Sequence, residues 1–63
     1  MSELEYVVSE CKERVQILTN ALAQGNIASH DEYRYVCGQI RGLEAACLVI
    51  TDLKKRLEDS DNE

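Results

Sequence analysis

The stretch QGNIASHDE, residues 24–32, divides the sequence into two helical segments. Gly25 is a typical helix stop, because the residue just beyond a helix end often takes a left-handed conformation that glycine adopts without strain. Ser29 and Glu32 have the spacing of a capping box, in which the serine side chain accepts a hydrogen bond from the glutamate amide and the glutamate side chain accepts one from the serine amide. The sequence therefore predicts that one helix ends and another begins within this stretch.

Both predicted helices extend outward from this break over most of the chain. Ser2 and Glu5 have the spacing of another capping box at the start of the first helix, and no proline interrupts either segment. A connection of about five residues makes the two helices antiparallel neighbours. We therefore predict a helical hairpin over residues 1–58, followed by an acidic disordered tail over 59–63. Within the hairpin, the elements are a helix over about 2–24, a turn over 25–29 and a helix over about 30–58.

Apolar residues repeat with heptad spacing in both segments, which is typical of helices that pack along one another. Alternating steps of three and four residues leave an apolar seam on one side of each helix. We expect the core of the hairpin to form where the two seams meet. Its predicted members are Leu4, Val8, Cys11, Val15, Leu18 and Leu22 in the first helix and Val36, Ile40 and Cys47 in the second.

The second segment also carries a row of small and apolar residues beside its seam. This glycine row, at mostly i, i+4 spacing, consists of Gly38, Gly42, Ala46, Val49 and Leu53. Glycine inside a helix costs about 1 kcal/mol relative to alanine, whereas small residues at this spacing let two helix backbones approach closely. Two interpretations are open: the row seats the first helix of the same hairpin, or it faces another chain.

We favour a contact with another chain, because two helices alone form one thin interface and leave apolar surface exposed. The expected interface is the glycine row together with Leu43 and Ile50. A chain of 63 residues buries little core of its own, and oligomerisation is one usual remedy. The predicted fold is therefore an all-α, antiparallel two-helix hairpin that assembles into a helical bundle as a dimer or higher oligomer.

Charge and composition exclude several classes of function. The net charge is −5, and residues 58–63 carry most of the excess acid, so the remainder is nearly neutral, unlike a nucleic-acid-binding surface. No run approaches the roughly 20 apolar residues of a membrane span, and the first residues lack the basic region of a signal peptide. Three cysteines without a C-x-x-C spacing do not resemble a secreted disulfide framework. We expect an intracellular protein in a reducing environment that binds neither nucleic acid nor membrane.

No residue pattern in the sequence indicates catalysis. A nucleophile elbow, a phosphate-binding glycine loop and an H-E-x-x-H motif are all missing from the sequence. A zinc site needs about four ligands, whereas His30 is the single histidine and lies far from Cys11 and Cys47 in the sequence. These cysteines and Cys37 are expected to be buried, reduced thiols. We predict no enzyme and no catalytic, cofactor, metal or small-molecule site.

One longer pattern runs from Tyr33 to Glu58. It reads Y-x-x-V-C-G-Q-I-R-G-L-E-A-A, followed by I-x-D-L-x-x-R-L-E. This pattern resembles small helical proteins encoded by tailed bacteriophages among genes for head and connector proteins. The resemblance implies a structural or assembly protein, in the host cytoplasm or the virion, that self-associates or docks on a larger capsid or portal-region protein. The alternative function is a small regulatory or inhibitory protein that binds a host protein, using its acidic tail.

Overall fold

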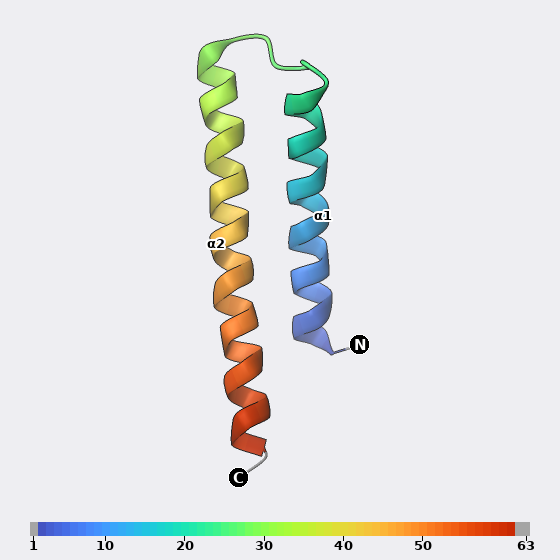
Figure 1. Ribbon diagram of the computed structural model, residues 1–63, viewed down its shortest axis with the longest axis vertical. Coiled ribbons are helices and arrows are strands. Elements are labelled where there is room, and N and C mark those ends of the chain that lie inside the picture. The colour runs from blue at the N-terminus through green and yellow to red at the C-terminus, as the bar shows by residue number, and fades with distance from the viewer. Residues whose placement is uncertain (1, 62–63) are drawn as a thin grey trace.

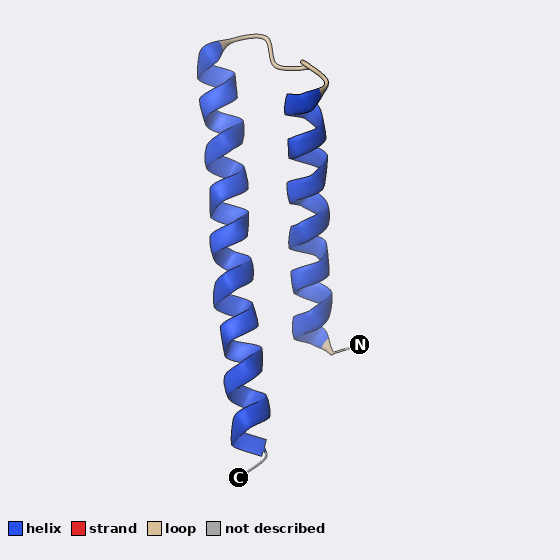
Figure 2. Ribbon diagram, in the orientation of Figure 1, coloured by secondary structure: helices blue, strands red, loops and turns tan. Residues whose placement is uncertain are grey.

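The computed structural model describes residues 2–61 and contains two helices. Helix α1 spans Glu3–Ala23 and helix α2 spans His30–Asp61, and the described part of the chain has no strand. The helices run antiparallel, side by side along their length (Figure 1; Figure 2). The result is a rod with extents of 52 × 19 × 13 Å. The prediction of an all-helical fold with two helices packed against each other is therefore confirmed.

Serine side chains cap the start of both helices. Ser2 Oγ accepts a hydrogen bond from the Glu5 amide at 3.2 Å, and Ser29 Oγ accepts one from the Glu32 amide at 3.1 Å. The Glu32 carboxylate accepts a hydrogen bond from the amide of Ala28 at 3.1 Å, rather than from that of Ser29. This carboxylate therefore reaches one residue further back than in a standard capping box, and ties the turn to α2.

The turn begins with the glycine that the sequence marks as a helix stop. Gly25 has a φ of 72°, in the left-handed region. Its amide donates to the Leu22 carbonyl at 3.2 Å, while the Asn26 amide donates to the Ala21 carbonyl at 3.1 Å. This pair of bonds is a Schellman motif, which satisfies carbonyl groups that the helix end leaves without partners. The cap residue is Gln24, so α1 ends one residue before the predicted boundary.

Helix α2 continues beyond its predicted end at residue 58. Residues 59–61 are helical, so the prediction of a disordered tail is wrong for them, and it lies outside the described residues for 62 and 63. The last turns are supported by ion pairs at i, i+4 spacing, between Lys54 and Glu58 at 3.5 Å and between Arg56 and Asp52 at 3.1 Å. An acidic run without glycine or proline does not stop a helix.

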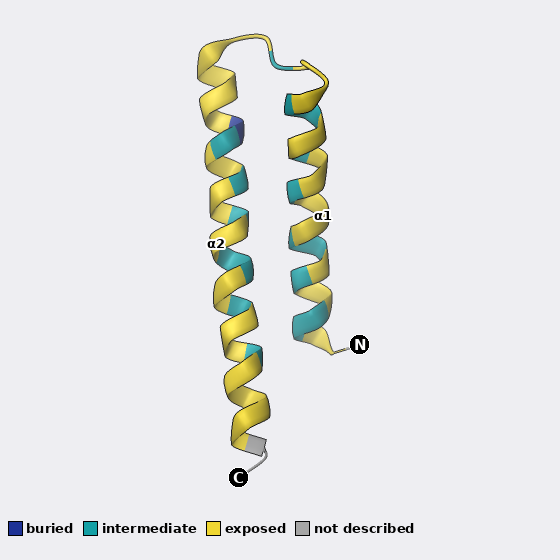
Figure 3. Cartoon of the chain, in the orientation of Figure 1, coloured by how far each residue is buried: buried dark blue, intermediate teal, exposed yellow. Residues whose placement is uncertain are grey.

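The core is a narrow strip between the two helices. Of the described side chains, Val36 alone is buried, with 7% of its surface exposed. The other predicted core residues are half-buried: Leu4, Val8, Cys11, Val15, Leu18, Leu22, Ile40 and Cys47. Figure 3 shows the half-buried positions following the inner sides of both helices, with exposed surface elsewhere. Each helix therefore has only one neighbour to pack against.

Candidate interaction surface

The two glycines of the glycine row face open space. A Cβ atom built on Gly38 or Gly42 would meet no atom within 4 Å, apart from near neighbours on α2 itself, in the part of the chain that the structure describes. Both residues are exposed. The interpretation that these glycines seat α1 closely against α2 is therefore wrong, because α1 does not approach them. The rotation of α2 turns its apolar seam toward α1 and its glycines away.

The remaining predicted interface residues divide into two groups. Val49 is 69% exposed and Leu53 is 45% exposed, although both have large apolar side chains. Leu43, Ala46 and Ile50 are half-buried, since Leu43 and Ile50 lie at heptad positions from Val36 and Ala46 is the member of the glycine row between Leu43 and Ile50 in the sequence. The structure thus places an apolar strip on α2 that begins at the edge of the core and continues onto exposed surface.

Two more apolar side chains extend this strip at its ends. Tyr35 is 68% exposed and precedes Gly42 by one heptad, so both lie on the same side of α2. Leu57 is 50% exposed and follows Leu53 by about one helical turn. Neither was included in the predicted interface. Heptad spacing from Gly42 identifies Tyr35, and the i, i+4 spacing of the glycine row, continued from Leu53, identifies Leu57.

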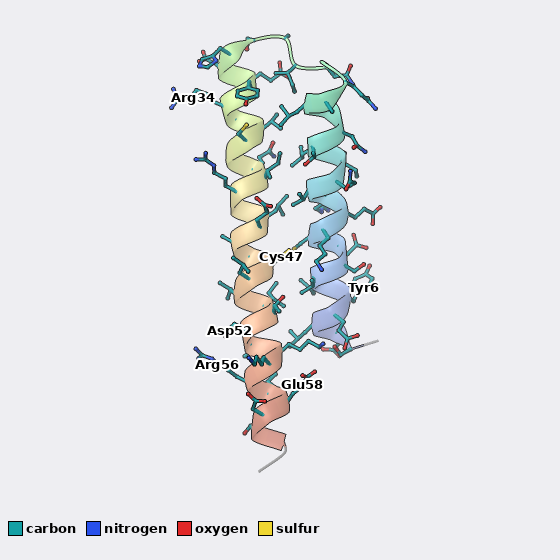
Figure 4. The ribbon with its side chains drawn as sticks, in the orientation of Figure 1. Tyr6, Arg34, Cys47, Asp52, Arg56 and Glu58 are labelled. Carbon is teal, nitrogen blue, oxygen red and sulfur yellow. The ribbon has the colours of Figure 1, made fainter. Side chains whose placement is uncertain are left out.

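Charged side chains lie beside the glycine row, with opposite signs in the two halves of α2. Arg34 and Arg41 are exposed in the half nearer the turn, and Asp52 and Asp59 are exposed in the other half. Figure 4 shows Arg34 and Arg56 extending from the side of α2 that is remote from α1. The strip therefore has two arginines beside one end and, beside the other, two aspartates together with Arg56, which pairs with Asp52 at 3.1 Å.

An ion pair joins the two helices at the open end of the hairpin. Lys54 Nζ lies 3.3 Å from Glu5 Oε1 and 3.5 Å from a carboxylate oxygen of Glu58. The hydrogen bond and charge of Glu5, and then the charge of Glu58, raise the pKa of Lys54. A shallow hollow of about 570 Å³ beside this pair is lined by Leu4 and Leu57 as well as the charged groups. Because these charges pair with one another, they form part of the hairpin contact.

Two cysteine thiols lie near each other across the seam. Cys11 and Cys47 are about two turns along each helix from the Glu5–Lys54 ion pair, and Cys47 points toward α1 in Figure 4. Burial, followed by a hydrogen bond with Cys11, raises the pKa of the Cys47 thiol. Both thiols are free and half-buried. Sequence reasoning treated them as separate core residues, because their pairing depends on the register of the two helices.

The other groups considered as chemical candidates are placed apart. His30 stacks on Tyr33 in the first turn of α2, with ring centroids 6.3 Å apart. Among residues 2–61, no cluster of three or more histidine, cysteine, aspartate or glutamate side chains is arranged to hold a metal ion. Neither of the two described helices has the length of apolar sequence that crossing a bilayer requires.

No family model, curated protein or solved structure matches this chain. The resemblance of Tyr33 to Glu58 to small helical phage proteins therefore stays a prediction.

Proposed function

We propose that this chain is a non-enzymatic structural or assembly protein that acts by packing α2 against another protein chain. The observation that carries the proposal is the open space at Gly38 and Gly42. Each glycine lowers helix stability by about 1 kcal/mol relative to alanine, and neither has a contact in the described hairpin that would offset this loss. A second helix packed against these positions accounts for the glycines, because small residues let two helix backbones approach closely.

The amount of exposed surface supports the same proposal. The accessible surface is 5131 Å², whereas the scaling of folded monomers predicts about 4,100 Å² for a chain of 7.1 kDa. The excess of about 1,000 Å² is comparable with the roughly 800 Å² that each partner buries in a standard interface. The excess results from the rod shape, because two helices have no second layer to cover them.

Within this class, we propose a phage assembly role. The pattern over Tyr33 to Glu58 supports this role, and it includes Gly38, Gly42 and Leu53 of the exposed strip. In this proposal the strip joins copies of the chain or docks on a larger capsid or portal-region protein. The protein then acts in the host cytoplasm during assembly or remains in the virion.

The test is the molar mass in solution, measured by light scattering over a range of concentrations with reductant present. We expect a mass above the 7.1 kDa of one chain, and we expect Gly42→Leu to reduce it, because leucine fills the space that a second helix occupies. Thr19→Leu adds the same side chain at an exposed position of α1 and serves as the control. Equal masses for both variants and the unchanged protein would contradict the proposed use of the glycine row.

Circular dichroism of the same samples separates assembly from folding. Gly42→Leu has open space around it and a better helix former than glycine, so the helical content of the hairpin is expected to stay the same or rise. A loss of helix in this variant would show that Gly42 serves the fold of the single chain.

A further inference from the structure

Small and large residues occupy opposite halves of the glycine row. Gly38 and Gly42 lie in the half of α2 nearer the turn, and Val49 and Leu53 lie in the other half. The midpoint of Gly42 and Val49 along the sequence lies between residues 45 and 46. The midpoint of Gly38 and Leu53 lies at the same place. An antiparallel second copy of α2 therefore brings a bulky apolar side chain level with a glycine at both positions. A parallel copy brings glycine level with glycine and leucine level with leucine.

The charges beside the row have the same symmetry. Arg41 with Asp52, and Arg34 with Asp59, are each centred between residues 46 and 47. This centre differs by one residue from that of the apolar pairs, so each arginine and its aspartate are offset by about 3 Å along the helix axis, which a flexible arginine side chain spans. All four side chains are exposed, and Asp52 also pairs with Arg56 of its own chain at 3.1 Å, which leaves the second carboxylate oxygen for the partner's arginine. Antiparallel copies therefore place each arginine opposite an aspartate, whereas parallel copies place like charges together.

A third pair follows the same rule. Tyr35 and Arg56 are centred on the midpoint between residues 45 and 46, and Tyr35 is 68% exposed. In an antiparallel pair the guanidinium group of one copy lies level with the aromatic ring of the other, which is a favourable arrangement for a cation and an aromatic face. Size, charge and aromatic pairing thus all select a second copy in one orientation.

Resting on the proposed function, we infer that the occupant of the glycine row is a second copy of this chain, with the two α2 helices antiparallel. The two-fold axis passes beside the midpoint between residues 45 and 46. Val49 of the partner subunit lies against Gly42, and Leu53 of the partner subunit lies against Gly38. The excess surface of about 1,000 Å² per chain is sufficient for such an interface.

Charge reversal tests this arrangement in the full chain, with sedimentation equilibrium as the measurement. Arg41→Asp alone and Asp52→Arg alone each create like-charge pairs in the antiparallel dimer, so we expect the dimer dissociation constant to rise roughly three- to tenfold. The double variant Arg41→Asp/Asp52→Arg recreates opposite pairs between the copies and should bind more tightly than either single variant, although it lacks the Asp52–Arg56 pair within each chain. Arg14→Asp, on the exposed surface of α1, makes the same change in net charge as Arg41→Asp and controls for overall repulsion. Circular dichroism confirms that each variant remains helical.

The outcomes separate this inference from the proposed function. A dimer that is weakened by both single changes and strengthened again by the double change supports the antiparallel pair. A dimer that is unaffected by the single changes, or affected equally by Arg14→Asp, overturns the arrangement while leaving self-association standing. A protein that stays at the mass of one chain at every concentration overturns the second copy as occupant, while docking on a larger structural protein remains the function to test.

Discussion

Replacing Val36 with alanine measures how much the seam contributes to the fold. Val36 is 7% exposed and packs between the helices. The change removes two buried carbon atoms, worth about 1.6 kcal/mol at about 0.8 kcal/mol each, and the remaining cavity adds to this loss. The better helix propensity of alanine returns about 0.5 kcal/mol. The net loss is roughly 1–2 kcal/mol, out of about 3–9 kcal/mol for a domain of this size.

The assay is thermal unfolding followed by far-UV circular dichroism at low protein concentration. A domain of this size loses about 4–8 °C in Tm per kcal/mol, so Val36→Ala should lower the Tm by roughly 4–16 °C. Val49→Ala is the matched control, because it makes the same chemical change where the side chain is 69% exposed. In the single hairpin, Val49→Ala should leave the Tm unchanged or raise the Tm slightly, because alanine is the better helix former. The reasoning is refuted if both variants lower the Tm equally under these conditions.

Three further changes test the turn, the ion pair and the thiols. Gly25→Ala should lower the free energy of unfolding by about 1 kcal/mol in urea titrations, since the φ of 72° strains a residue that has a Cβ atom; an unchanged midpoint would show that the turn adopts another conformation. The hydrogen bond with Glu5, followed by the charge of Glu5, raises the pKa of Lys54 in the folded protein. This interaction therefore stabilises the fold fully below pH 10.5, the ordinary pKa of lysine, and the stabilisation is lost as the pH rises through the higher pKa of the folded protein. The Tm of the unchanged protein should therefore fall above that pH. This fall should be smaller in Lys54→Met and unchanged in Lys55→Met, where the lysine is exposed. Glutathione disulfide should join Cys11 to Cys47 by two thiol–disulfide exchange steps that release two glutathione thiols, and peptide mapping that finds neither residue in a disulfide within one chain would contradict their contact.

Local features of the hairpin could be predicted from the sequence, because short-range hydrogen bonds define them. Gly25 needed a left-handed conformation, and Ser29 needed an amide three residues ahead, whatever the rest of the chain does. The end of α2 was misplaced for a related reason. The acidic composition after residue 58 predicts a tail, although residues 59–61 form the i to i−4 hydrogen bonds of a helix.

Features that depend on how the two helices meet could not be obtained from the sequence. The heptad pattern identifies the seam, but the rotation of α2 determines whether Gly42 contacts α1 or open space. Likewise, the proximity of Cys11 and Cys47 depends on the register of the two helices, as does the Glu5–Lys54 ion pair. The spacing within one helix is periodic and carries no information on its alignment with another helix.

The unequal lengths of the helices lead to a gradient of local stability along α2. Helix α1 has 21 residues and α2 has 32, and α2 extends past the start of α1 at the open end of the hairpin (Figure 1). Turns beyond the Glu5–Lys54 ion pair have no opposing helix, so their amide groups open without separating the seam. Hydrogen exchange should therefore be slow around Val36 and progressively faster toward residue 61, with local opening preceding global unfolding.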